Sequence, residues 1–155
     1  MGVMAGSTGL HAHPGQELAM THHISAMINS HPGAAGGMDK EKLAECIAAC
    51  FECAQVCSSC ADACLGEDMV AELTTCIRTD LDCTDICGAT GTILSRQTGT
   101  NTDIVRAMLE ACRTACAVCA EECEQHADMH EHCKICAEAC RRCETGCANL
   151  LSTLA

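Results

Sequence analysis

The stretch CIAACFECAQVCSSCADAC, residues 46–64, contains six cysteines among nineteen residues. Successive cysteines are separated by alternating steps of four and three residues. Because an α-helix turns once every 3.6 residues, this alternation keeps all six thiols on one face. The stretch therefore predicts a helix that carries a stripe of sulfur along one side.

The same alternation recurs in three further segments of the chain. It is the pattern of core positions in a helix bundle, so cysteine is predicted where an ordinary bundle has leucine. The members of the stripe beyond the first segment are Met69, Leu73, Cys76, Asp80, Cys83, Cys87, Thr90 and Leu94, then Cys112, Cys116, Cys119, Cys123 and His126, and finally Cys133, Cys136, Cys140, Cys143 and Cys147.

Capping residues and turns divide the second part of the chain into four helices. No proline follows Pro32, and the predicted connections are short, which favours long antiparallel neighbours. The fold class is therefore predicted to be all-α, an up-down-up-down four-helix bundle. The predicted helices cover about 39–65, 69–97, 102–126 and 128–151, with Asp39, Asp68, Asn101 or Thr102, and Asp128 as their N-caps.

Residues 1–38 differ from the bundle domain, residues 39–155. They contain no cysteine but five of the eight histidines and five of the eight methionines, together with many glycines. We expect a largely flexible leader with a short helix over about 16–29. Its histidines and methionines are expected to be incidental to the chemistry of the bundle.

Composition excludes several classes of function. A net charge of -12, one phenylalanine and no tryptophan or tyrosine argue against nucleic-acid binding. No apolar run approaches the ~20 residues of a membrane span, and the first residues do not resemble an export sequence. We therefore expect a cytosolic protein, in which dense cysteine indicates metal or redox chemistry more than disulfides. No catalytic dyad or nucleotide-binding loop is evident, so we do not expect an enzyme.

The eighteen cysteines allow several interpretations. One or two buried cysteines would be explained by an ordinary core, but eighteen on one stripe are not. Thiols one turn apart on a helix have little freedom to reach disulfide geometry. CSSC, CAVC and CKIC are each half of a zinc or iron–sulfur motif, but zinc sites use separate groups of four ligands. An iron–sulfur or dithiol electron-transfer protein, and a metallothionein-like zinc or cadmium protein, remain alternatives.

Cu(I) fits the stripe better, because it prefers soft thiolate ligands. Thiolates one turn apart, or facing each other across a bundle, can bind such an ion and can bridge two ions. Each Cu(I) also replaces one thiol proton, so a buried core stays near neutral as it fills. The pattern therefore predicts storage of many Cu(I) ions, about one per cysteine.

The repeated Cx3Cx2C pattern, CIRTDLDCTDIC and CEQHADMHEHCKIC together resemble the bacterial copper storage proteins, and most closely their cytosolic branch. The resemblance covers about residues 40–150. It implies a four-helix bundle that stores Cu(I) along a cysteine-lined core and that commonly assembles as a homotetramer. A copper chaperone or a small thiol is the expected delivery partner.

One end of the bundle is predicted to be a mouth through which copper passes. His126 lies on the stripe, His130 follows four residues later and Cys133 three after that, so imidazoles end a tube of thiols. His132 lies off the stripe and is the weaker candidate. The predicted metal ligands are Cys46, Cys50, Cys53, Cys57, Cys60, Cys64, Cys76, Cys83, Cys87, Cys112, Cys116, Cys119, Cys123, Cys133, Cys136, Cys140, Cys143, Cys147, His126, His130 and Asp80.

Asp80 is the one acidic member of the stripe. A buried lone carboxylate is unfavourable, so Asp80 is either an oxygen ligand or proton acceptor, or an exposed residue or salt-bridge partner of Arg78 or Arg113. At the end opposite the mouth we predict an apolar plug that includes Leu43, Ile47, Leu94, Leu109 and Leu150. The off-stripe residues Ile77, Leu81, Ile86 and Ile135 are candidates for a subunit interface.

Overall fold

The computed structural model describes residues 14–33 and 37–155, which form helices joined by short turns. The elements are α1 (Pro14–Ser30), α2 (Lys40–Leu65), the short 3-10 helix η1 (Val70–Glu72), α3 (Thr74–Leu94), α4 (Thr102–His126) and α5 (Glu131–Leu151).

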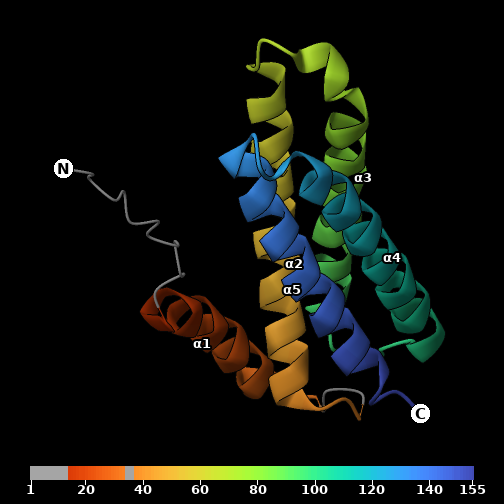
Figure 1. The fold of residues 1–155 in the computed structure, drawn as a ribbon. Helices are drawn as coiled ribbons and strands as arrows, with labels where there is room; N and C mark the ends of the chain where they lie inside the picture. Colours follow the sequence, from red (N-terminus) through yellow and green to blue (C-terminus); the bar gives the residue numbers. More distant parts are fainter. Residues whose placement is uncertain (1–13, 34–36) are drawn as a thin grey trace.

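Helices α2 to α5 form the predicted antiparallel bundle (Figure 1). α2 packs against α3 and α5, and α4 packs against the same two helices. The α2–α3 and α4–α5 turns lie at one end, and the α3–α4 turn at the other. We call the first the histidine end, because His130 and His132 lie there at the start of α5, and the second the plug end, because Leu94 lies there at the end of α3. The short leader helix is also confirmed: α1 packs on α2 outside the bundle. The predicted flexibility of residues 1–13 and 34–36 lies outside the described residues.

Two helix starts agree with the capping predictions. The Asp39 carboxylate accepts a hydrogen bond from the Lys42 backbone N–H at 2.9 Å, so it caps α2. The Asn101 side chain accepts from the backbone N–H groups of Asp103 and Ile104, so it caps α4. Both side chains satisfy donors that the first helical turn leaves without intrahelical partners.

Two other helix starts were predicted wrongly. α3 begins at Thr74 rather than 69, because the chain first forms η1 and buries Leu73 completely at the N-cap position; it also ends at Leu94 rather than 97. α5 begins after His130, which caps it without a side-chain hydrogen bond, so Asp128 is not the cap. The burial of Leu73 and His130 against other helices, rather than a capping side chain, therefore sets where α3 and α5 begin.

The core contains the predicted tube of sulfur. All eighteen cysteines are buried and free. The predicted apolar plug is confirmed at the plug end, where α2 and α4 begin and α3 and α5 end. It consists of Leu43, Ile47, Leu94, Leu109 and Leu150, all buried.

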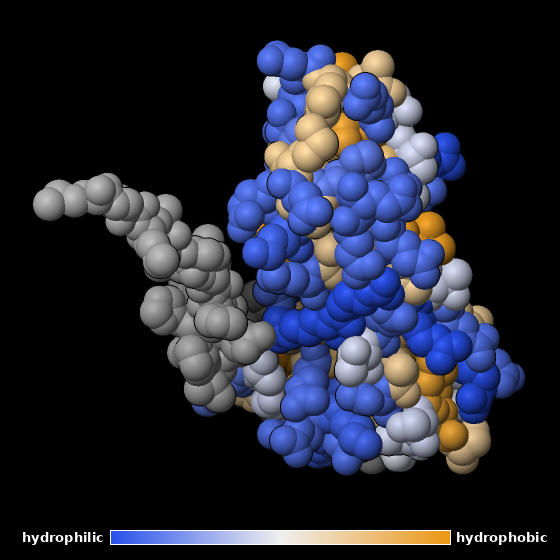
Figure 2. Space-filling view, viewed as in Figure 1, coloured by the Kyte–Doolittle hydropathy of each residue, from blue (hydrophilic) through white to orange (hydrophobic). Residues whose placement is uncertain are grey.

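The outer surface shown in Figure 2 is mostly hydrophilic over the bundle. Within the described residues, α2 alone is long and apolar enough to cross a membrane by length and composition. This corrects the expectation that no apolar run approaches that length, which gave too little weight to alanine and cysteine. α2 packs against α3 and α5, and 56% of its most apolar window is buried in the structure.

Candidate metal centre

The thiols form a continuous chain of contacts along the bundle axis. At the plug end, the sulfur atoms of Cys46 and Cys147 lie 3.9 Å apart. In the middle, the Cys57 sulfur lies 3.5 Å from that of Cys140. Towards the histidine end, the Cys76 sulfur lies 3.7 Å from that of Cys123. These separations are far longer than the ~2.05 Å of a disulfide, so the chain consists of thiols in contact.

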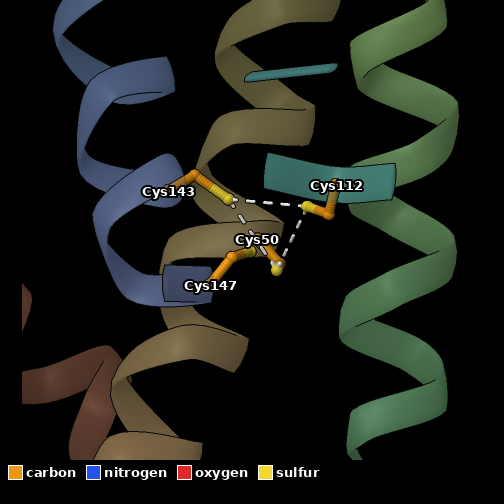
Figure 3. Close-up of side chains that lie close together, drawn as sticks. All are labelled: Cys50, Cys112, Cys143 and Cys147. Carbon is orange, nitrogen blue, oxygen red and sulfur yellow. Dashed lines mark hydrogen bonds between the residues drawn. The ribbon is translucent and has the colours of Figure 1, made fainter. Parts of the chain in front are cut away.

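Ligand atoms from several helices converge at each level of the tube. Figure 3 shows one level, where Cys50 of α2, Cys112 of α4, and Cys143 and Cys147 of α5 point toward one another. The sulfur of Cys143 lies 3.8 Å from the sulfur of Cys50 and 3.9 Å from the sulfur of Cys112. A small rotation of side chains would let a soft ion bind between such pairs.

The four-thiol groups share members, so the tube does not divide into separate four-ligand sites. Cys53 and Cys57, for example, each belong to at least two groups. In a closed structural zinc site, by contrast, four ligands bind one ion. The groups within 4.8 Å include Cys50–Cys112–Cys143–Cys147, Cys53–Cys87–Cys116–Cys143, Cys53–Cys57–Cys83–Cys140, Cys57–Cys119–Cys136–Cys140 and Cys60–Cys64–Cys76–Cys133.

The thiols at the histidine end differ in acidity. Burial raises the pKa of the Cys64 and Cys133 thiols, because the thiolate loses its hydration. Hydrogen bonds with the thiols of Cys123 foremost and Cys76 outweigh the opposite effects of Cys136 and burial, and lower the pKa of Cys60 to about 6. His132 contributes to the same effect. Of Cys60, Cys64 and Cys133, Cys60 is thus the one whose pKa is lowered.

Asp80 lies fully buried among thiols of the facing helices. Its Oδ1 accepts hydrogen bonds from the thiols of Cys119 at 3.0 Å, Cys136 at 3.2 Å and Cys123 at 3.5 Å. Burial raises the pKa of Asp80 far above its usual range, and Cys136 and Cys119 add to the effect. Asp80 is therefore a neutral acid in the metal-free core.

The interpretations of Asp80 as an exposed residue or as a salt-bridge partner are wrong. The side chain is not exposed, and its described hydrogen bonds are with thiols rather than with Arg78 or Arg113. Arg78 instead pairs with Asp82 at 3.0 Å on the surface. The stripe position predicted its burial correctly.

Two histidines meet at the histidine end on one carboxylate. His130 Nδ1 lies 3.1 Å from Glu67 Oε1, and His132 Nε2 lies 2.9 Å from the same oxygen. The two rings stack with centroids 5.3 Å apart. His132 Nδ1 lies 3.4 Å from the sulfur of Cys60 and 3.5 Å from that of Cys133. The His130 side chain is 8% exposed, and its Nε2 is buried without a hydrogen-bond partner.

His126 is placed differently from the other two. Its Nε2 lies 3.2 Å from Glu122 Oε1 one turn earlier on α4, and its side chain is 22% exposed. The structure thus brings together His130 and the off-stripe His132, while His126 faces Glu122. Met129 is exposed and Met69 is half-buried. Periodicity did not predict that His132 and Glu67 meet, because their contact joins α5 to the α2–η1 connection.

Comparison with known proteins agrees with this arrangement. Residues 39–152 match the family model of the copper storage proteins, Csp. An uncharacterized cysteine-rich protein of Bacillus subtilis (strain 168), YhjQ, is 33% identical over 105 residues, which are 68% of this chain and 92% of that protein.

Two solved structures from Streptomyces lividans are also similar. The copper storage protein Ccsp, loaded with 10 copper equivalents, is 53% identical with a TM-score of 0.83, covering 84% of this chain and 99% of its own. A cytosolic copper storage protein with five coppers is 57% identical with a TM-score of 0.73, covering 74% of this chain and 96% of its own. The fold, the thiol-lined core and the family match together show that this chain belongs to the copper storage protein family.

Proposed function

We propose that this protein stores Cu(I) along its thiol-lined core, at about one ion per cysteine. The observation that carries the proposal is the continuous chain of buried free thiols through the whole bundle. Copper-loaded relatives of the same family support the choice of metal. The iron–sulfur, dithiol and zinc alternatives find no support in these relatives.

Loading is an exchange of protons for copper. Each Cu(I) binds thiolate and releases a thiol proton, so the charge of the buried core changes little. Because neighbouring sulfur atoms already lie 3.5–4.0 Å apart, each thiolate can bridge two ions without movement of the backbone. The ion is therefore held away from water and from other cellular thiols.

The proposed ligands are the eighteen cysteines, His126, His130 and Asp80, and the geometry adds His132. Neutral imidazole binds Cu(I) less tightly than thiolate does, which suits histidines that pass the ion inward. Asp80, with three thiols converging on one oxygen, is proposed as an oxygen ligand or proton relay.

The same proposal covers location and assembly. The Streptomyces lividans protein is described as cytosolic, and we propose a cytosolic, non-enzymatic store here, supplied by a copper chaperone or a small thiol. We also propose a homotetramer, with exposed Leu81 and Ile135 and half-buried Ile77 and Ile86 as interface candidates.

Metal competition tests the choice of Cu(I). The reduced protein would be incubated anaerobically with equal excess of Cu(I) and Zn²⁺, and in a separate sample with Fe²⁺ and sulfide. Each sample would be desalted and analysed for metal and protein. Many copper ions per chain, with only traces of zinc and iron, are expected. Bound iron with labile sulfide, or one zinc for every two to four thiols, would contradict storage of Cu(I).

A further inference from the structure

Glu67 lies in the connection between α2 and η1, and it is the only carboxylate that the described contacts place against two histidines. The same oxygen, Oε1, faces His130 Nδ1 at 3.1 Å and His132 Nε2 at 2.9 Å. The Glu67 side chain is one-third exposed, whereas His130 is buried. One partly exposed acidic residue thus contacts both imidazoles of the proposed mouth.

These contacts fix the tautomers of both rings. An ionised carboxylate only accepts hydrogen bonds, so the ring nitrogen that faces Glu67 must carry the hydrogen. In the neutral ring, the opposite nitrogen then carries the lone pair. For His132 this nitrogen is Nδ1, which points at Cys60 and Cys133. For His130 it is Nε2, which is buried without a partner.

Resting on the proposed function above, we propose that Glu67 is the positioning residue of the copper mouth. It holds His130 as the Nδ1–H tautomer and His132 as the Nε2–H tautomer, so both rings present a lone pair to an incoming ion. Carboxylate partners have this effect on many metal-binding histidines, fixing the tautomer and the ring orientation. The negative charge of Glu67 also favours a cation beside these rings.

His130 is the ring most dependent on Glu67. Neutral histidine in water is mainly the Nε2–H tautomer, so His132 adopts the ordinary form while His130 adopts the less common one. Without the Glu67 oxygen, His130 has no described partner that retains hydrogen on Nδ1. Its Nε2 would then carry the hydrogen, and the lone pair would be lost from the buried side of the mouth.

The first test is a tautomer measurement on the reduced, metal-free protein, at a pH where both imidazoles are neutral. Long-range ¹H–¹⁵N NMR should show hydrogen on Nδ1 of His130 and on Nε2 of His132. In Glu67→Ala, His130 should change to the Nε2–H form. Glu67→Gln, which keeps an oxygen acceptor, should restore most of the native pattern. An unchanged His130 tautomer in Glu67→Ala would overturn the proposal.

The second test measures transfer of Cu(I) from a chromophoric chelator by anaerobic stopped-flow. Glu67→Ala should load about tenfold more slowly, with Glu67→Gln between it and the native protein and capacity equal in all three. Glu131→Ala, which removes an exposed charge at the same end, should load at the native rate. If Glu131→Ala slowed loading equally, the effect would come from the loss of negative charge at this end, which would contradict the positioning role.

Failure of this inference is distinct from failure of the storage function. A native protein that takes up only a few ions contradicts storage, while the tautomers still report on Glu67. Full capacity with unchanged rates and tautomers in Glu67→Ala contradicts the role of Glu67 alone. Circular dichroism of each variant identifies a folding defect, and Glu67→Gln keeps the test decisive if Glu67→Ala is unfolded.

Discussion

At the residue scale, Asp80 shows how burial among thiols keeps a carboxyl group protonated. A buried carboxylate without a cation is costly, and in the described residues no cation faces this one. The group therefore stays protonated while three thiols donate hydrogen bonds to it. A neutral acid at this position is compatible with a neutral thiol core, and it holds three potential ligands around one point.

The raised pKa of Asp80 predicts how the metal-free protein responds to pH. Below about pH 4 the carboxyl is protonated in both folded and unfolded chains, so its burial does not change stability with pH. Above that pH only the unfolded chain releases the proton, and the folded state loses relative stability. Asp80→Asn should therefore raise the melting temperature of the reduced apoprotein at pH 7 by several degrees, with the gain disappearing towards pH 4.

Thermal unfolding followed by circular dichroism at pH 4 and pH 7 measures this difference. Asp82→Asn is the matched control, because Asp82 is exposed on the same helix and pairs with Arg78. It should change the melting temperature little at either pH. A lower melting temperature for Asp80→Asn at pH 7 would mean that Asp80 stabilises the core as an ion.

The histidines give a second prediction at this scale. His132→Ala should slow Cu(I) loading more than His126→Ala, because His132 Nδ1 lies within 3.5 Å of two thiols while His126 faces Glu122. Replacing His126 and His130 together should also slow loading. Stopped-flow rates and final stoichiometries measure both effects. A large loss of capacity in any of these variants would argue against a role confined to the mouth.

At the element scale, the apolar plug stabilises the bundle separately from the sulfur. Leu150 and Leu109 are fully buried where α5 ends and α4 begins. Leu150→Ala should lower the free energy of unfolding of the apoprotein by about 2–4 kcal/mol, because it leaves a cavity in a packed site. Cu(I) capacity should not change, since no thiol is removed.

Chemical denaturation with a Cu(I) titration of the same sample measures both quantities. Leu65→Ala is the control, because Leu65 is 61% exposed at the end of α2 and should cost little. If Leu150→Ala lost copper capacity in proportion to stability, the plug and the store would not be separate units.

The elements also show which features the sequence could predict. The 3/4 periodicity and the side-chain caps Asp39 and Asn101 correctly predicted α2, α4 and the buried stripe, because these features depend on residues close in the chain. The starts of α3 and α5 depend instead on burial of Leu73 and His130 against other helices. Periodicity has no information on such contacts.

The same reason explains the histidine end. His132 lies off the stripe of its own helix, and its partner Glu67 is 65 residues earlier in the chain. The relative phase of α2 and α5, which brings them together, is set by packing of the whole bundle. The sequence favours His126 because this residue continues the periodic pattern, but the pattern does not include the competing carboxylate of Glu122.

At the scale of the whole molecule, we predict that helix packing rather than metal arranges the thiols. Replacing all eighteen cysteines with alanine should abolish tight Cu(I) binding and leave a helical protein, because alanine is the best helix former and the apolar plug remains. Far-UV circular dichroism and chelator competition would measure the two properties. An unfolded variant would show that sulfur packing, and not the plug, holds the apoprotein together.

The most direct test of the account is an anaerobic Cu(I) titration of the reduced native protein against a chromophoric chelator, with helicity recorded before and after. The account predicts an apoprotein that is already helical and saturation near one ion per thiol, about eighteen per chain. Saturation at a few ions, or helicity that appears only when metal is added, would contradict a preformed copper store.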